Sequence, residues 1–153
     1  MLTVVVQGQE QAVELPYATD RCVIPVEDGL VVWNQGQEHL LYFILPSGEI
    51  QELFYAPCMC SDSAVNVFND YIYLSIERYE GYDIFGIGLE HFSNDNIQGS
   101  YKINWRTGKS VKCSDQVYSG LFIFGDAGLI GCEQKTGKIV LMDFDYNVIK
   151  ELK

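Results

Sequence analysis

The sequence predicts an all-β domain, and the composition and the turn sequences are the observations that predict it. A chain of 153 residues has the size of one domain, and 48% hydrophobic with 20% charged residues is an ordinary globular mixture. Aromatic residues reach 13% and there are 14 glycines, a profile that favours strands and turns. Turn sequences separate the apolar runs, namely Glu27-Asp28-Gly29, Pro46-Ser47-Gly48, Thr107-Gly108-Lys109 and Thr136-Gly137-Lys138.

Short runs of β-branched and aromatic residues, mostly with a period of two, predict the individual strands. Only residues 62–79 could instead form a helix, but the run Tyr71-Ile72-Tyr73-Leu74 favours a strand there. The expected strands lie near Thr3–Gln7, Cys22–Val26, Leu30–Trp33, Leu40–Leu45, Ile50–Tyr55, Ala64–Phe68, Tyr71–Glu77, Ile84–Leu89, Tyr101–Trp105, Ser110–Cys113, Leu121–Phe124, Leu129–Glu133, Ile139–Phe144 and Val148–Leu152. The side chains expected in the core are Val31, Trp33, Phe43, Leu45, Ile72, Leu74, Ile84, Ile123, Ile130 and Leu141.

An internal repeat groups these strands. Residues 27–53 and 126–152 align without a gap at an offset of 99, with identities that include Gly29/Gly128 and Leu30/Leu129. A weaker copy lies between them at an offset of 41, where residues 26–31 match residues 67–72 in character. The single domain 1–153 is therefore expected to hold three repeat units, at about 21–55, 63–113 and 119–152. The predicted fold is three repeated antiparallel sheets, arranged as a partial β-propeller or as a propeller-like sandwich.

Two turns carry a resemblance to a known kind of repeat. The stretches Trp105-Arg106-Thr107-Gly108-Lys109 and Lys135-Thr136-Gly137-Lys138-Ile139 are similar to the Thr-Gly-Lys turn of quinoprotein-type β-propeller blades. The resemblance to quinoprotein and WD-type repeats implies four-stranded blades, although no complete WD signature is present. Three blades are fewer than the roughly 4–8 of a closed propeller, so open sheet edges are expected to need covering or pairing.

No residue pattern predicts catalysis or a cofactor. Cys58-Met59-Cys60 has no second cysteine pair and no nearby histidine, so a zinc site is not expected. Gly86-Ile87-Gly88 has His91 where the dinucleotide-binding fingerprint needs its third glycine. Asp143-Phe144-Asp145-Tyr146-Asn147 begins like a calcium loop, but Val148 stands where that loop needs glycine. The protein is therefore expected to be non-enzymatic, with no catalytic residue, metal or cofactor.

The charge of the chain is strongly segregated. The net charge is -11, with -13 in residues 1–100 and +2 in residues 101–153. Nucleic acids and anionic membranes are not expected as partners, because both need a basic surface. No run approaches the roughly 18 apolar residues of a membrane span, and the N-terminus lacks a basic signal region, so the expected location is cytoplasmic. In that compartment the five cysteines are expected to be free thiols.

The segment Glu77-Arg78-Tyr79-Glu80-Gly81-Tyr82-Asp83 is the expected partner-binding loop. It joins two apolar runs, and it offers two tyrosines together with three carboxylates that can receive arginine or lysine. In the repeat alignment it corresponds to Gln35-Gly36-Gln37-Glu38 and to Lys135-Thr136-Gly137-Lys138. The expected partner-binding residues are Glu38, Glu77, Tyr79, Glu80, Tyr82 and Asp83.

The whole profile, which is small, acidic and without catalytic motifs, is similar to the immunity proteins of bacterial contact-dependent growth-inhibition and polymorphic toxin systems. That resemblance implies a cytoplasmic, non-enzymatic protein that binds a basic protein partner. The candidate partner is a nuclease toxin domain, whose active site the immunity protein would occlude. The alternative is a propeller-like module that binds a ligand or a carbohydrate, or that acts as a scaffold, because aromatic residues are abundant.

Overall fold

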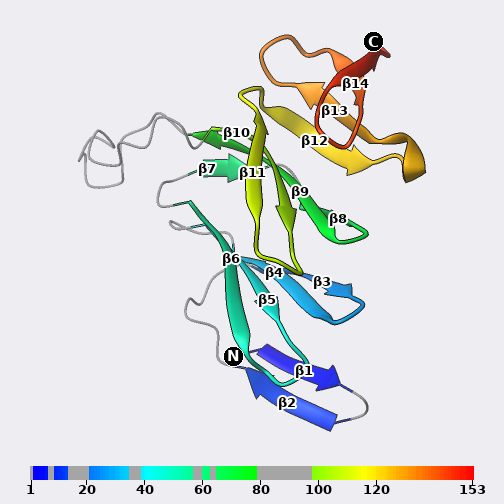
Figure 1. Cartoon of the computed structure of the whole chain (residues 1–153). Helices are drawn as coiled ribbons and strands as arrows, with labels where there is room; N and C mark the ends of the chain where they lie inside the picture. The colour runs from blue at the N-terminus through cyan, green and yellow to red at the C-terminus, as the bar shows by residue number, and fades with distance from the viewer. Residues whose placement is uncertain are drawn as a thin grey trace, which may run out of the picture.

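The structure, a computed structural model, is built almost entirely from β-strands (Figure 1). It describes residues 2–6, 9–13, 21–34, 39–56, 60–62, 65–78 and 98–153, with side chains described for 23–33, 41–54, 65–76 and 98–153. Within these ranges the chain forms three antiparallel sheets that are each four strands wide, and a separate hairpin. The predicted all-β class with three antiparallel sheets is therefore confirmed. The same residues contain no helix long and apolar enough to cross a membrane.

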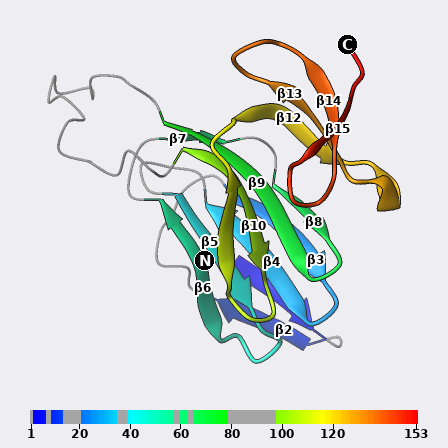
Figure 2. The ribbon, with the colours of Figure 1, turned by 45° about the horizontal axis from the view of Figure 1, so that its top comes forward.

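The first sheet is a meander of β3 (Arg21–Val26), β4 (Gly29–Asn34), β5 (His39–Ile44) and β6 (Ile50–Ala56). The N-terminal hairpin of β1 (Leu2–Val6) and β2 (Gln9–Val13) lies beside this sheet in both ribbon views (Figures 1 and 2).

The middle sheet contains β9 (Tyr71–Arg78), β10 (Gly99–Asn104) and β11 (Ser110–Ser114). Two short strands, β7 (Cys60–Asp62) and β8 (Asn66–Phe68), pair with successive stretches of β9 and together take the place of its first strand. In residues 62–79, where the sequence favoured a strand over a helix, the structure has the strands β8 and β9. The expected strand Ile84–Leu89 lies outside the described residues.

The third sheet is again a meander, and it lies at one end of the stack of sheets (Figure 2). Its strands are β12 (Tyr118–Ile123), β13 (Leu129–Glu133), β14 (Ile139–Met142) and β15 (Val148–Glu151). A short 3-10 turn, η2 (Gly125–Ala127), joins β12 to β13.

Two hydrophobic cores bury both faces of the middle sheet. One face packs against the first sheet and the other against the third, so neighbouring residues of β9 enter different cores. The first core contains Val31, Trp33, Leu41, Phe43, Leu53 and Phe54 from the first sheet and Ile72, Leu74, Ile76, Tyr101, Ile103 and Trp105 from the middle sheet and the turn after β10. The second core joins Tyr73 of the middle sheet to Tyr118, Leu121, Leu129, Val140, Met142 and Tyr146.

Five of the nine described side chains that were expected in the core are buried, and the other four are half-buried. Val31, Trp33, Phe43, Ile72 and Leu74 are 5% exposed or less. The half-buried members of the expected core are Leu45, Ile123, Ile130 and Leu141, and Ile84 lies outside the described residues. Ile130 and Leu141 share a face of the third sheet that turns away from the middle sheet, which is why their burial is incomplete.

The register of the middle sheet corrects the predicted repeat by one residue. The turn Glu27-Asp28 lies between the paired residues Val26 and Gly29, and the turn Asn69-Asp70 lies between the paired residues Phe68 and Tyr71. The turns therefore match at an offset of 42, whereas similarity of character predicted 41. A slip of one residue moves every side chain to the other face of a strand.

With the corrected register the three sheets are stacked head to tail. Val31 then corresponds to Tyr73. Val31 faces the middle sheet and Tyr73 faces the third sheet, so the first and middle sheets each use the same face to contact the sheet that follows. In the third sheet Leu129 pairs with Met142, as Leu30 pairs with Ile44 in the first sheet. Leu129 and Met142 face the middle sheet, whereas Leu30 and Ile44 face away from it. This use of opposite faces by successive sheets is compatible with a propeller-like arrangement.

The repeated glycine has a steric reason at both of its positions. A Cβ on Gly29 would lie 2.2 Å from the Ile44 carbonyl oxygen, and a Cβ on Gly128 would lie 1.9 Å from that of Met142. Strand pairing gives Ile44 and Met142 equivalent positions on the third strands of their sheets, at an offset of 98, so the ungapped alignment at 99 is wrong by one residue in that strand. The identity Gly29/Gly128 thus marks a close approach between the start of the second strand and the end of the third.

The two Thr-Gly-Lys turns share a conformation but not a position in their sheets. Gly108 and Gly137 have φ values of 72° and 71°, and each amide donates to the carbonyl four residues earlier. The turn at Gly108 joins the third and fourth strands of the middle sheet, whereas the turn at Gly137 joins the second and third strands of the third sheet. Their similarity therefore reflects local turn chemistry and not equivalent places in a repeat.

Tyr146 of the third sheet forms hydrogen bonds to the middle sheet. It lies in the turn between β14 and β15 with a φ of 65°, a left-handed conformation that is unusual for a bulky residue. Its hydroxyl donates to the Tyr101 carbonyl at 2.8 Å, and the Leu74 carbonyl lies at 3.3 Å. Burial of the ring raises the pKa of Tyr146 well above its ordinary value.

Two buried serines make a second polar link between these sheets. The Ser75 and Ser100 hydroxyl oxygens are 2.9 Å apart, and neither side chain is exposed. The Tyr118 amide donates to Ser75 at 2.8 Å, while the Ser100 hydroxyl donates to the Gln116 carbonyl at 2.8 Å. The chain that enters the third sheet is thus hydrogen-bonded to the face of the middle sheet.

We predict that Gly128→Ala destabilises the protein more than Gly120→Ala. Both glycines have a positive φ, 62° at Gly120 and 135° at Gly128, so both changes cost about 1–3 kcal/mol of backbone strain. Only at Gly128 does the added Cβ meet a carbonyl oxygen, which should cost about 1–3 kcal/mol more, because Gly120 has open space around it. Urea unfolding of the two variants measures the difference, and equal losses would contradict the close approach.

We predict that stability falls above pH 10 and that Tyr146→Phe weakens this dependence. The raised pKa of Tyr146 means that the folded state keeps its proton while the unfolded chain ionises near pH 10. The unfolded state then binds fewer protons, so the free energy of unfolding falls as the pH rises. Urea unfolding between pH 8 and pH 11 tests this. At pH 8, loss of the hydroxyl should cost about 0.5–1.5 kcal/mol. An unchanged pH slope in the variant would be inconsistent with a buried, protonated Tyr146.

Candidate functional site

The side chains of the predicted partner-binding loop lie outside the described part of the chain. Glu77 is placed by its backbone alone, in β9, where its Cα pairs with that of Ser61. The other residues of the prediction, which fall outside the described residues, are Glu38, Tyr79, Glu80, Tyr82 and Asp83. Their role in binding stays a prediction.

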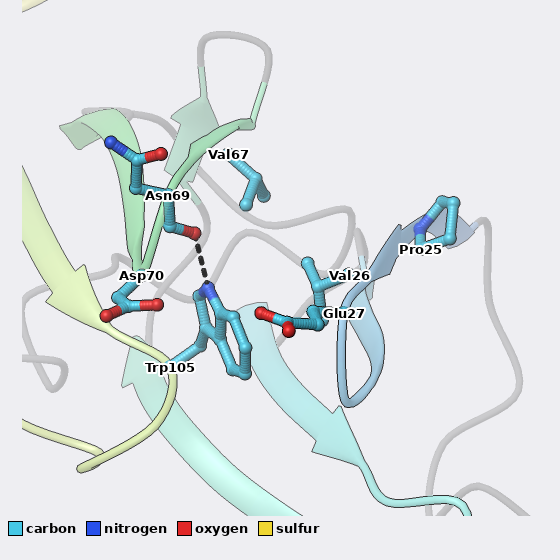
Figure 3. Close-up of a pocket in the computed structure, with 7 residues that line it drawn as sticks. All are labelled: Pro25, Val26, Glu27, Val67, Asn69, Asp70 and Trp105. Atoms are coloured by element: carbon cyan, nitrogen blue, oxygen red, sulfur yellow. Dashed lines mark hydrogen bonds between the residues drawn. The ribbon is translucent and has the colours of Figure 1, made fainter.

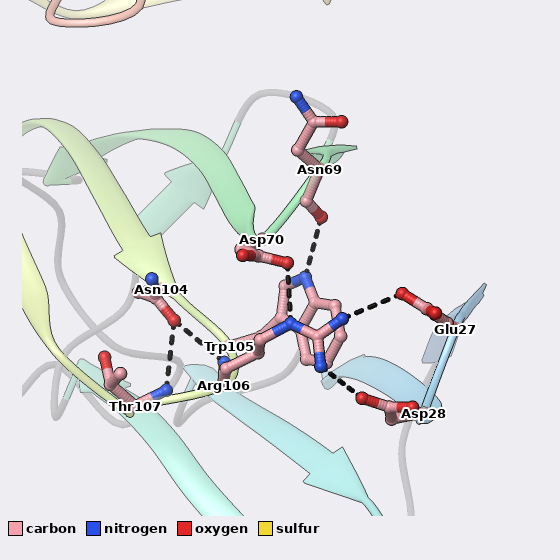
Figure 4. A network of polar contacts seen from close by, with 8 residues as sticks. All are labelled: Glu27, Asp28, Asn69, Asp70, Asn104, Trp105, Arg106 and Thr107. Carbon is pink, nitrogen blue, oxygen red and sulfur yellow. Dashed lines mark hydrogen bonds and ion pairs between the residues drawn. The ribbon is translucent and has the colours of Figure 1, made fainter.

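The described residues bring a different set of acidic side chains together, at the opposite end of the same strands. Glu27 and Asp28 form the turn that precedes β4, and Asp70 belongs to the equivalent turn that precedes β9. Glu38 and residues 79–83, in contrast, follow β4 and β9. Because the first and middle sheets pack face to face, the two turns lie next to each other, and we call Glu27, Asp28 and Asp70 the acidic cluster (Figure 4).

The guanidinium of Arg106 occupies the centre of the acidic cluster (Figure 4). Its Nε donates to Asp70 at 2.7 Å, one terminal nitrogen donates to Glu27 at 2.9 Å, and the other pairs with Asp28. The hydrogen bonds to Asp70 and Asp28 raise the pKa of Arg106 above its ordinary value. One arginine thus meets three carboxylates from two sheets, and the group keeps a net charge of -2.

The turn that carries Arg106 is itself held in a fixed conformation. The Asn104 side-chain oxygen accepts hydrogen bonds from the Arg106 and Thr107 amides, at 2.9 and 3.0 Å. The guanidinium lies 4.4 Å from the ring centroid of Trp105, a cation–π distance. Arg106 is therefore placed by its own turn and by the ring beside it, as well as by its ion pairs.

Trp105 joins the acidic cluster to the first core. Only 2% of the residue is exposed, and its ring centroid is 5.2 Å from that of Phe43. The indole N–H donates to the Asn69 carbonyl at 2.9 Å, and the Trp105 amide donates to the Asp70 carbonyl at 3.0 Å. Asn69 has a φ of 53°, a left-handed conformation that asparagine tolerates, and its carbonyl meets the indole.

A pocket of about 640 Å³ opens between the first and middle sheets beside this group (Figure 3). Glu27 and Asp70 contribute carboxylates to its wall, and Trp105 lies at its side. The remaining lining residues are Pro25, Val26, Val67 and Asn69. The lining of the pocket is more polar than apolar and includes two acidic groups, a composition that suits a cationic group more than an anionic one.

The exposure of the acidic cluster leaves it open to a partner. The side chains of Glu27, Asp28 and Asp70 are 79%, 55% and 46% exposed. Each carboxylate has two oxygens, and Arg106 uses one oxygen of each. The second oxygens can accept further hydrogen bonds from an arginine or a lysine of another protein.

The aspartates of the calcium-like motif serve their own turn. The Asp143 carboxylate accepts hydrogen bonds from the Asp145 and Asn147 amides and from the Asn147 side chain, each at 2.9 Å. Asp145 pairs with Lys102 at 3.1 Å. Among the described residues, no group of three or more histidine, cysteine, aspartate or glutamate side chains could hold a metal ion.

Sequence reasoning missed the acidic cluster, although the sequence contained part of the signal. The repeat alignment, at an offset of 41, matched Glu27-Asp28-Gly29 with Phe68-Asn69-Asp70, and both segments contain acids. Arg106 had been noticed only as part of a Thr-Gly-Lys turn. Asp28 and Arg106 are 78 positions apart in the sequence, and no local pattern joins them.

Comparison of the chain with family models, with curated proteins and with solved structures finds no match.

We predict that Arg106→Gln lowers the thermal unfolding temperature at pH 7 and low salt. The change leaves three carboxylates close together without their cation, so they repel one another. The loss should shrink in about 1 M NaCl, where the screening length is roughly 3 Å. Lys109→Gln removes an exposed charge from the same turn and should have little effect. Equal melting temperatures for the two variants at low salt would show that the acidic cluster does not need its arginine.

Proposed function

We propose that this protein is a non-enzymatic, acidic binding protein that neutralises a basic protein partner in the cytoplasm. Within that class we propose an immunity protein that inhibits a nuclease toxin by occluding its active site. The observation that carries the proposal is the acidic cluster, which holds three exposed carboxylates around one arginine, two of them in the lining of a pocket. Residues 1–100, which supply the first sheet and the strands β7 to β9, carry a net charge of -13, so Glu27, Asp28 and Asp70 belong to the acidic part of the chain.

The chemistry of a nuclease cleft fits such a surface. The cleft is cationic because it binds phosphates, so carboxylates can take the positions that the substrate would fill. The acidic cluster already binds one guanidinium, and the second oxygen of each carboxylate can accept further hydrogen bonds. Complementary charge also speeds association and makes it sensitive to salt.

Ion pairs alone do not account for tight inhibition. Exposed pairs contribute roughly 0–1 kcal/mol each, so a tight complex needs pairs that are desolvated and aromatic side chains that anchor them. Tyr79 and Tyr82 of the predicted loop are the proposed anchors. These tyrosines follow β9 in the sequence, whereas the residue Asp70 of the acidic cluster precedes it. Reversing the charge of the acidic cluster and of the predicted loop in separate variants can therefore show which of the two binds the partner.

A carbohydrate- or ligand-binding module is the alternative, and the pocket is the observation in its favour. Sugar-binding sites commonly present the exposed face of an aromatic ring. Trp105 is nearly buried, lies between Arg106 and Phe43, and already uses its N–H. These contacts favour a protein partner over a stacked sugar. Retention of the protein on a carbohydrate matrix, reversed by free sugar, would support the alternative.

We predict that Glu27→Lys/Asp28→Lys weakens binding to the basic nuclease domain encoded by a neighbouring gene by about tenfold or more. Co-expression with that domain measures protection of the cells, and surface plasmon resonance measures affinity and association rate. Glu80→Lys/Asp83→Lys tests the predicted loop in the same way. Asp115→Lys/Asp126→Lys is the control, because it makes the same charge change at exposed acids beside and within the third sheet.

The three double variants distinguish the possible interfaces. Loss of binding in one of the first two, but not in the control, assigns the interface to that end of the strands. Equal weakening in all three would mean that only net charge matters. If the first two variants bind and protect like the wild type, neither end is the interface and the proposal fails.

A further inference from the structure

The third sheet presents an apolar row on the face that turns away from the middle sheet. Strand pairing places Phe122, Ile130, Leu141 and Lys150 side by side across all four strands. We call these four residues the outer row. Residues directly opposite in an antiparallel pair lie on the same face, so the outer row crosses one surface of the sheet.

The outer row is equivalent to a row that is buried in the first sheet. Ile130 and Leu141 pair with each other as Val31 and Phe43 do. Val31 and Phe43 pack against the middle sheet and are only 0% and 5% exposed. Ile130 and Leu141 are only half-buried, and Phe122 is 48% exposed. Neither Ile130 nor Leu141 belongs to a core cluster of the described residues. The equivalent faces of the first and middle sheets are buried by the sheet that follows, whereas this face of the third sheet is partly exposed.

We propose that this face binds the same face of a second copy of the chain, forming a two-fold symmetric dimer. With the two-fold axis parallel to the strands and between β13 and β14, the outer row meets its copy in reverse order. Ile130 then packs on Leu141 of the partner subunit, and Phe122 lies against Lys150 of the partner subunit. The row is self-complementary, because an apolar centre meets an apolar centre and a cation meets an aromatic ring.

The charge distribution favours the third sheet as the place where two copies meet. Each chain carries -11, of which residues 1–100 contribute -13, whereas residues 117–153, which contain the third sheet, hold five acids and four bases and contribute only -1. Two copies repel each other least when the acidic sheets point away from the contact. Figure 2 shows the third sheet at one end of the stack, so docking through it holds the acidic first sheets at opposite ends of the dimer.

The first sheet does not offer a competing face at the other end of the stack. At the centre of its outer face Val32, Tyr42 and Ile44 are 2% exposed or less, while Val23, on the edge strand β3, is 39% exposed. A head-to-tail contact between the third sheet of one copy and the first sheet of the next would need those residues uncovered. A symmetric contact uses the same surface on both copies and closes at two, which excludes a growing filament.

The dimer does not depend on the proposed function. The acidic cluster belongs to the first and middle sheets and stays exposed when the third sheets meet. A dimer would therefore present two acidic clusters, and loss of dimerisation would leave binding of the basic partner by each copy intact.

Sedimentation velocity of the full chain between about 1 and 200 µM tests the proposal. The expected result is a monomer–dimer equilibrium that is stronger at high salt, where repulsion between the acidic sheets is screened. Phe122→Glu and Ile130→Lys should each raise the dimer dissociation constant about tenfold or more. Val111→Glu is the matched control, because Val111 is 45% exposed but lies on the middle sheet, and it should leave the constant unchanged.

Circular dichroism of each variant separates loss of dimer from loss of fold. Thermal melts that match the wild type, with a monomeric mass for the two face variants, would support the proposal. A wild type that stays monomeric at 200 µM, or that grows beyond a dimer, would overturn it. So would a dimer that the face variants leave as tight as that of the wild type.

Discussion

Ile72 and Tyr73 are neighbours in β9, yet their side chains enter two different cores. That arrangement holds the described part of the molecule together, because the first and third sheets both bury their apolar faces on the middle sheet. A sheet buried on both faces needs apolar side chains at successive positions, which is why Tyr71-Ile72-Tyr73-Leu74 reads as a continuous run. Ser75 continues the strand with a polar side chain, and its hydrogen bonds to Ser100 and Tyr118 compensate for its burial.

The fold class and most strands could be predicted because they depend on local pattern. Turn sequences such as Pro46-Ser47-Gly48 separate the strands, and the repeated Gly29 and Gly128 hold equivalent places. The register of the middle sheet could not be predicted, since Tyr71 and Ile72 are both apolar and an offset of 41 or 42 fits either face. The acidic cluster was missed for a different reason. Its carboxylates come from two turns and its arginine from a third, and only the packing of two sheets brings them together.

The residues proposed for binding also connect the first sheet to the middle sheet. Arg106 pairs with Glu27 and Asp28 from one sheet and with Asp70 from the other. A partner that draws these carboxylates toward its own cations would compete with Arg106, so binding and the fit between the two sheets are coupled. The rigid placement of Arg106 by Asn104 and Trp105 reduces the rearrangement that such competition requires.

The meander order of the strands also bears on how the chain reaches its structure. Each sheet is formed by one continuous stretch, and apart from β7, which pairs with β9, its strands pair with their neighbours in sequence, so most contacts within a sheet are local. A ribosome releases the first sheet before the middle one and the middle one before the third. Each newly made sheet therefore meets an apolar face that is already in place, and the transit of a few dozen residues separates one docking step from the next. Tyr146, near the end of that order, can engage the carbonyls of Leu74 and Tyr101 only after the middle sheet has formed.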